Sequence, residues 1–336
     1  SASANYLLYD SGQRKLQNEK NEANLELTEL QVENLSQTLF FNASQLYYSI
    51  AQAMFNFNLL QSAIEESKER VRRAKINFDF GSGGKVEVLN AQVDVSRDSL
   101  NLLSVYTDIE NLKWQLNQLT LREDINYKVD TTIVLTYEMF SVAALEEEMM
   151  LGNIELKTLR RNVELLVYDE RIASKINSPT INANGAYNLN YQNNDQKSQL
   201  DFSRGSGLNV GLAANWNFVD GGQKRVQEQL AQVNKNSAEI DLNNKINELK
   251  IQLNRLWNNY KNNLLTMRLE SQNINTTAVN FERVRELFNN GQQSSIEFRQ
   301  AQLNMINAQS QYFNARAIAK LYEVEIDFLL GKLSFD

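Results

Sequence analysis

The sequence predicts a mainly α-helical protein with a small β part, in which long antiparallel coiled-coil helical hairpins form two tandem repeats. Three observations support this fold class: a duplication at a constant offset, apolar rows with seven-residue spacing, and two segments of apolar–polar alternation. The composition allows it, because the single proline, Pro179, leaves long helices uninterrupted almost everywhere else.

Composition also excludes most catalytic chemistry. The 336 residues include neither cysteine nor histidine, so thiolate metal sites, catalytic cysteines and triads with an imidazole base are ruled out. The sequence contains no phosphate-binding loop and no paired carboxylates beside a nucleophile. A net charge of −7 disfavours nucleic acid as a partner, because phosphate binding needs clustered Lys and Arg. We predict a protein that is not an enzyme and that has no metal or cofactor.

Each repeat consists of a short strand end, an Asp-Gly turn, a long helix, a glycine-containing break and a second long helix. Residues 9–15 recur at 219–225, and this offset of 210 carries Gly81 and Glu87 onto Gly291 and Glu297 without a gap. Such a register favours true duplication over two helices of similar composition. We divide the chain into a first repeat at 1–120 with its tip near 79–85, an equatorial mixed segment with a helix at 121–178, and a second repeat at 179–336 with its tip near 289–295.

The first long helix is predicted from about residue 13 to residue 78. Apolar side chains recur along it every seven positions, a pattern typical of helices that supercoil on partners: Ala43, Ile50, Phe57, Ile64, Val71 and Phe78. The returning helix of the second repeat has alanines at the same spacing, which allow a neighbouring helix to approach closely: Ala301, Ala308 and Ala315. An ordinary helical hairpin in a soluble bundle would share these patterns. A helix of about 100 Å, at 1.5 Å per residue, favours a tube or stalk.

Strand-like alternation lies within residues 180–218, the predicted membrane hairpin. One segment runs from Ile181 to Tyr191 and the other from Leu208 to Phe218, with a polar stretch at 192–206 between them. Apolar residues alternate there with Asn, Gly and Ala, as in tilted strands that cross a bilayer in a β-barrel. Aromatic residues near the segment ends would form membrane girdles: Tyr187, Tyr191, Trp216 and Phe218. A soluble hairpin with one buried face remains the alternative.

One hairpin cannot span a membrane, because its edges would leave backbone groups without hydrogen-bond partners. The offset of 210 aligns Tyr6 and Leu8 with Trp216 and Phe218, so we expect the chain to start partway along a third strand whose hairpin partner precedes Ser1. Four strands per chain are too few for a useful barrel. We therefore expect several copies to share one barrel.

The combined pattern resembles the TolC-like outer-membrane efflux protein family over essentially the whole chain. The resemblance rests on the turns at 10–12 and 220–222, on the breaks with their following helices at 80–92 and 290–302, and on residues 153–156, where the family usually has Pro in place of Ile154. It implies a homotrimer with a 12-stranded outer-membrane β-barrel and a helical tunnel across the periplasm of a Gram-negative bacterium. Residues 121–178 would form a belt around the middle of the tunnel.

The resemblance further implies a passive exit duct: a channel-tunnel subunit of a tripartite efflux or type I secretion system for small molecules or proteins. Its partners would be outer-membrane lipid, a periplasmic adaptor and, through the adaptor, an inner-membrane pump. The tip positions that the family offers to adaptors are Gly81, Ser82, Gly291 and Gln292. Plain turn chemistry, in which glycine supplies a positive φ, also explains the two glycines.

Acidic side chains just after the second tip ring the pore entrance in this family. Glu297 matches the first such position, and Gln300 occupies the second, where an Asp is common. Three copies of Glu297 on a symmetry axis would favour cations. Alternatively, Glu297 is a solvated carboxylate that stabilises the start of its helix through the macrodipole.

A different class of protein stays open at this point: a soluble coiled-coil scaffold or a periplasmic adaptor-like interaction protein. It would explain the heptads and the charge, but not the alternation in 180–218.

Overall fold

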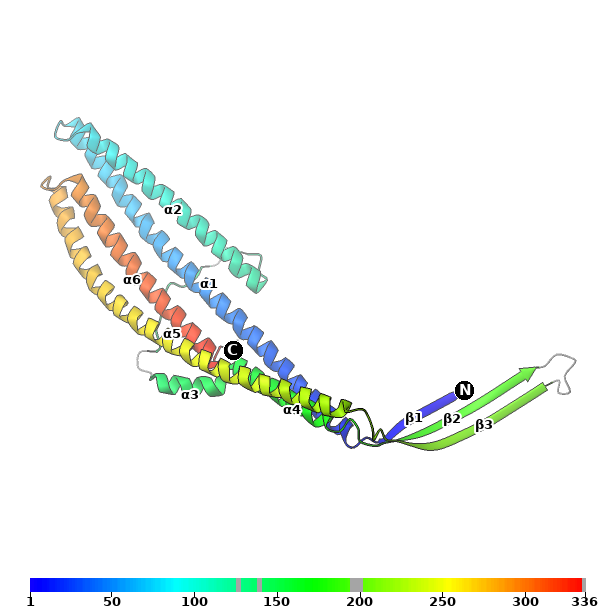
Figure 1. Ribbon diagram of the computed structural model, residues 1–336. Helices are drawn as coiled ribbons and strands as arrows, with labels where there is room; N and C mark the ends of the chain where they lie inside the picture. Colours follow the sequence, from blue (N-terminus) through cyan, green and yellow to red (C-terminus); the bar gives the residue numbers. More distant parts are fainter. Residues whose placement is uncertain (125–127, 138–140, 194–201, 334–336) are drawn as a thin grey trace. The chain divides into compact units, whose positions relative to one another are not determined.

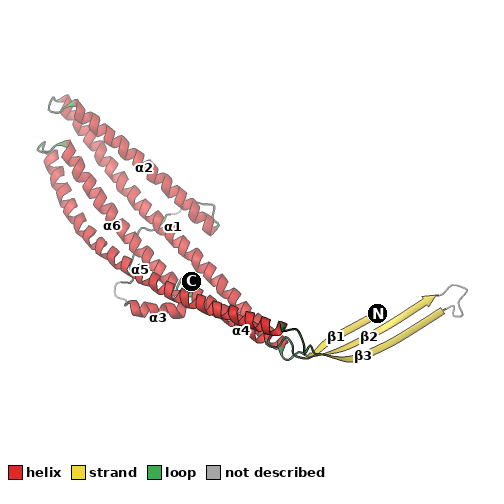
Figure 2. Ribbon diagram, viewed as in Figure 1, coloured by secondary structure: helices red, strands yellow, loops and turns green. Residues whose placement is uncertain are grey.

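A computed structural model describes residues 1–124, 128–137, 141–193 and 202–333. Within these residues the chain forms one three-stranded sheet and six helices (Figures 1 and 2). In chain order the elements are β1 (Ala2–Tyr9), α1 (Gln13–Asp79), α2 (Lys85–Thr120), α3 (Val142–Gly152), α4 (Ile154–Ala173), β2 (Thr180–Asn193), β3 (Phe202–Asn215), α5 (Gln223–Asn289) and α6 (Ser295–Leu330).

The helix bounds confirm the duplication. Helices α1 and α5 each have 67 residues, and α2 and α6 each have 36. Every end of α5 and α6 lies 210 residues after the corresponding end of α1 and α2. The two long hairpins, α1–α2 and α5–α6, are therefore the same structural unit repeated.

The chain divides into two compact units, and each unit draws on both repeats. The first contains residues 1–33 and 154–246, and the second contains residues 34–153 and 247–336. The sheet, α4 and the N-terminal parts of α1 and α5 belong to the first unit. The remainder of the two hairpins, with α3 and the segment 128–137, belongs to the second unit.

The sheet of the first unit is antiparallel, with strand order β1-β2-β3. In the β2–β3 register, Ile181 lies opposite Ala214 and Tyr187 opposite Leu208, so the apolar rows of the two strands share a face. The predicted alternation is confirmed, but the predicted bounds of the second strand were wrong. β3 starts at Phe202 and ends at Asn215, because main-chain pairing with β2 continues through residues 202–206, where the regular alternation of apolar residues is lost.

The loop after α4 holds both strand-to-helix turns of the first unit. Lys175 Nζ donates to the Ser11 carbonyl oxygen at 2.8 Å, in the turn before α1. Asn177 donates to the Asp220 carboxylate, in the turn before α5. The same carboxylate accepts the backbone N–H groups of Gly222 and Lys224 and so caps α5. One short loop thus fixes the start of both long helices.

Apolar clusters of the second unit join α1, α2, α6 and the segment 128–137. Phe55 of α1 stacks on Phe313 of α6 with ring centroids 4.1 Å apart, and Ile133 packs beside them. The buried carboxylate of Glu323 on α6 accepts the backbone N–H groups of Thr136 and Tyr137. The segment is therefore fixed by apolar packing and by one buried acid.

A tight contact joins α3 to the end of α6. A Cβ at Gly152 would overlap the Leu330 carbonyl oxygen, and Asn153 Nδ2 donates to the Leu329 carbonyl oxygen at 2.9 Å. Helix α4 then begins at Ile154, a first-turn position that also tolerates proline. This contact explains why glycine and asparagine precede α4 in this sequence.

In the described part of the chain, no helix carries an apolar run long enough to cross a membrane.

Candidate functional site: hairpin tips and sheet faces

The hairpin tips are glycine turns, as predicted. After α1, Gly81 has a φ of 73°, and after α5, Gly291 has a φ of 71°. The Ser82 and Gln292 backbone N–H groups reach back to carbonyl oxygens of the last helical turns, at Asn77 and Leu287. These bonds close a helix end of the kind that requires a left-handed residue, which explains the glycines.

Glu297 forms a reciprocal cap at the start of α6. The Ser294 hydroxyl accepts the Glu297 N–H at 3.2 Å, and the Glu297 carboxylate accepts the Ser294 N–H at 3.1 Å. The Ser294 hydroxyl also donates to this carboxylate at 2.6 Å. Hydrogen bonds from Ser294 lower the pKa of Glu297, with the side-chain bond contributing more than the backbone bond. The exposed carboxylate is charged at neutral pH, which both interpretations of this residue require.

A groove of about 980 Å³ lies between the two tips in the second unit. Three of the predicted docking residues line it, namely Ser82, Gly291 and Gln292. Gln300 also lines the groove, whereas Gly81 and Glu297 lie outside its lining. The structure therefore brings most of the predicted tip residues together and separates Glu297 from them.

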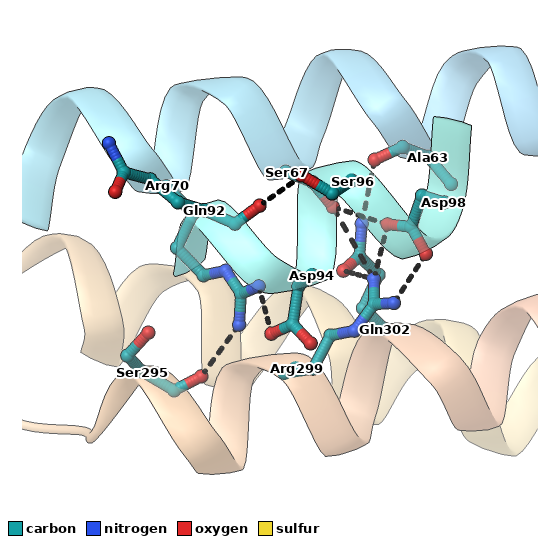
Figure 3. Close-up of polar contacts among 10 residues, drawn as sticks. All are labelled: Ala63, Ser67, Arg70, Gln92, Asp94, Ser96, Asp98, Ser295, Arg299 and Gln302. Carbon is teal, nitrogen blue, oxygen red and sulfur yellow. Dashed lines mark hydrogen bonds and ion pairs between the residues drawn. The ribbon is translucent and has the colours of Figure 1, made fainter. Parts of the chain in front are cut away.

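A buried polar network, which sequence patterns did not predict, ties α6 to the first hairpin beside this groove (Figure 3). Arg299 of α6 forms a bidentate ion pair with Asp98 of α2, at 2.5 and 2.9 Å. The Ser67 hydroxyl of α1 donates to the same carboxylate at 2.9 Å. Gln302 accepts from Arg299 at 2.9 Å and donates to the Ala63 carbonyl oxygen at 3.1 Å. All four polar side chains are buried.

A second ion pair lies closer to the tips. Arg70 of α1 contacts Asp94 of α2 at 2.5 Å and donates to the Ser295 carbonyl oxygen of α6 at 3.4 Å.

The sequence does carry one signal for the network around Arg299. Asp98 interrupts an otherwise apolar heptad row on α2, and the offset of 210 places it at Ala308 of the second repeat. A lone acid in such a row needs a partner when it is buried.

The sheet presents two chemically distinct faces. The apolar face carries the alternating row of all three strands: Ala2, Ala4, Tyr6, Ile181, Ala183, Tyr187, Leu189, Tyr191, Leu208, Val210, Leu212 and Ala214. The opposite face, here called the amide face, carries a group of asparagines among small residues: Asn5, Asn182, Asn184, Asn188, Asn190 and Asn209. Leu208, Val210 and Leu212 are 72 to 80% exposed, so the described residues leave this part of the apolar face open.

The four predicted girdle aromatics are exposed, at 45% for Tyr187, 71% for Tyr191, 64% for Trp216 and 76% for Phe218. Tyr187 and Tyr191 lie on β2. Trp216 and Phe218 follow the end of β3, so the prediction that they are strand residues was wrong. The reason is local: Trp216 Nε1 donates to the Asn177 carbonyl oxygen at 3.0 Å, and its ring packs on Phe218. These bonds direct the chain toward the turn at Asp220.

The model of the outer membrane efflux protein family matches residues 147–332. No curated protein sequence matches the chain significantly.

Solved structures share the fold. The outer-membrane channel OprN has a TM-score of 0.81 at 15% identity, covering 98% of this chain and 74% of that one. The outer membrane protein VceC from Vibrio cholerae has a TM-score of 0.77 at 14% identity, covering 98% and 78%. The CmeC outer membrane channel from Campylobacter jejuni has a TM-score of 0.75 at 19% identity, covering 98% and 70%.

Proposed function

Because the chain belongs to the outer membrane efflux protein family, we propose that it is one subunit of a homotrimeric channel that carries exported small molecules or proteins out through the outer membrane. The three strands would contribute to a shared β-barrel in the membrane. The helical hairpins would form a tunnel in the periplasm.

The uncovered apolar face of the sheet carries this proposal. Leu208, Val210 and Leu212 lie in one row, and each is at least 72% exposed. Leaving a contiguous apolar row in water is unfavourable by about 25 cal/mol per Å², whereas lipid acyl chains would cover it without cost. The opposite amide face would then line a water-filled lumen, as the alternation of membrane barrels requires.

Unpaired edges and apolar stripes support assembly from several copies. Within the described residues, β1 and β3 each have one edge without a neighbouring strand, and lipid would leave such edges unsatisfied. Exposed apolar residues also form a stripe with seven-residue spacing on α2, at Val86, Val93 and Leu100. Helix α5 has exposed apolar residues as well, among them Leu265. A stripe on one helix that packs against a different stripe of the next copy generates a ring when the rotation closes.

The tips would form the periplasmic entrance. We assign the groove lined by Ser82, Gly291 and Gln292 to a periplasmic adaptor that connects the channel to an inner-membrane pump, with Gly81 shaping the turn. Glu297, charged and exposed, would ring the entrance and favour cations, and Gln300 in place of a second acid would weaken that preference.

Oligomeric mass and conductance test the proposal together. The purified full-length protein, in detergent and then in a planar bilayer, should have the mass of a trimer and should conduct ions. A species that stays monomeric or dimeric without detergent, and that conducts nothing, would replace the channel with a soluble coiled-coil scaffold.

A further inference from the structure

Arg204 is an isolated charge in the sheet. Within β1, β2 and β3 it is the one charged residue, and it lies near the hairpin end of β3, away from the helices. The register pairs it with Tyr191, and steps of two residues connect it through Ser206 to Leu208. Arg204 is therefore on the apolar face, where its side chain is exposed. A guanidinium in that row calls for an anionic partner.

The depth of Arg204 follows from strand geometry. Ten residues separate Arg204 from Ala214, which is about 34 Å along a strand at 3.4 Å per residue. A strand tilt of about 40° reduces this to about 26 Å along the membrane normal, close to the roughly 25 Å height of an outer-membrane apolar band. Trp216 lies just beyond the other end of this span. Arg204 and Trp216 therefore mark the two boundaries of one apolar band.

An arginine at such a boundary suits a phosphate. Guanidinium binds phosphate oxygens in a bidentate manner, and its long stem lies along apolar surface while its head stays polar. On the same face Leu189 is the next residue after Tyr191 along β2, and Leu208 lies one step beyond Ser206 along β3, so acyl chains that cover these leucines would lie near a bound phosphate. This arrangement favours a phosphate attached to a lipid over one free in solution.

We propose that Arg204, with Tyr191 beside it, binds the phosphate of a phosphorylated lipid in the leaflet at the hairpin end of the sheet. The inference rests on the membrane placement proposed above. In an outer membrane the lipid of this chemistry is the phosphorylated glycolipid of the outer leaflet. The site would fix the vertical position of the sheet in the bilayer.

Lipid retention tests the site. The full-length protein is reconstituted in phosphatidylcholine vesicles containing either bisphosphorylated lipid A or the same lipid with its phosphates removed, and bound lipid per protomer is measured by native mass spectrometry. We expect the wild type to retain the phosphorylated form preferentially. Arg204→Gln should weaken that retention about tenfold or more. Arg204→Lys keeps the charge but not the two parallel N–H donors of the guanidinium, and it should weaken retention less.

The matched control is Arg225→Gln, an exposed arginine in the first turn of α5 at the other end of the sheet, which should retain lipid like the wild type. Equal retention by Arg204→Gln and wild type would overturn the site, as would an equal loss in Arg225→Gln. Full displacement of the lipid by millimolar inorganic phosphate would overturn the choice of a lipid ligand. Failure of the wild type to insert into either vesicle would instead overturn the membrane placement, and the lipid site with it. If Arg204→Gln fails to insert, Arg204→Lys takes its place in the test. Retention of the phosphorylated lipid by Arg204→Lys that does not exceed its retention of the dephosphorylated lipid would overturn the proposed phosphate binding.

Discussion

Replacing Arg299 with methionine removes one partner of the buried ion pair at the hairpin tips. Asp98 is 4% exposed and would keep the Ser67 hydroxyl as its remaining donor. An uncompensated buried charge of this kind typically costs about 3 to 5 kcal/mol. Replacing both residues, as in Arg299→Met with Asp98→Leu, removes the charge and its desolvation cost, and such apolar replacements are often neutral.

Hydrogen exchange of the tip amides is the appropriate assay, because large assemblies rarely unfold reversibly as a whole. At 1.4 kcal/mol per factor of ten, the single variant should exchange the amides around 94–102 and 295–303 about 100- to 4,000-fold faster than the wild type. The double variant should return most of the way to wild-type protection. The two changes are strongly coupled in this reasoning, since the pair and not either residue determines the cost.

The matched control is an ion pair of similar geometry on the surface. Arg72 contacts Glu69 at 2.5 and 2.8 Å, but the two side chains are 62% and 44% exposed. Solvent screens such a pair, so Arg72→Met should change exchange less than about fivefold. Wild-type protection in Arg299→Met, or no recovery in the double variant, would refute the assignment of Arg299 and Asp98 as a coupled buried pair.

Three further predictions concern single residues. Glu297→Gln should shift the reversal potential of the reconstituted channel toward weaker cation preference, and an unchanged potential would remove Glu297 from the entrance. Burial raises the pKa of Asp327, so its contribution to stability is full below the ordinary Asp pKa of 3.8 and is lost as pH rises through the raised value. Asp327→Asn should therefore abolish that decline in a pH series of apparent Tm values, while keeping an acceptor for the Tyr137 hydroxyl. Gly81→Ala or Gly291→Ala should each destabilise its tip by about 1 to 2 kcal/mol through backbone strain alone, because nothing lies within 4 Å of the added Cβ. Limited proteolysis should then cut faster at the changed tip only.

Local patterns were sufficient to predict the long elements. The glycines at 81 and 291 require left-handed turns, and the offset of 210 places every helix end of the second hairpin from the first. Alternation of side chains was enough to assign the apolar face, because the period of two is a property of any strand. These features depend on neighbours in sequence, which is why they can be read from it.

Features that depend on distant partners could not be predicted in the same way. The true ends of β3 follow from main-chain pairing with β2 and from the Trp216 bond to Asn177, neither of which alternation records. The ion pair of Arg299 joins residues 201 positions apart. Glu323 anchors a segment 187 positions away through backbone N–H groups, which leave no mark on side-chain identity. The lone acid at Asp98 was the one signal available.

Cysteine accessibility on the two faces of β3 tests the membrane placement most directly, because these 336 residues contain no cysteine that would react in the background. Asn209→Cys and Val210→Cys lie on adjacent residues but on opposite faces, the amide face and the apolar face. In the reconstituted protein, a charged, membrane-impermeant thiol reagent should modify Asn209→Cys and reduce its conductance, while Val210→Cys should stay unmodified within lipid. Equal modification of both positions would contradict a sheet with one face in lipid and the other toward a water-filled pore.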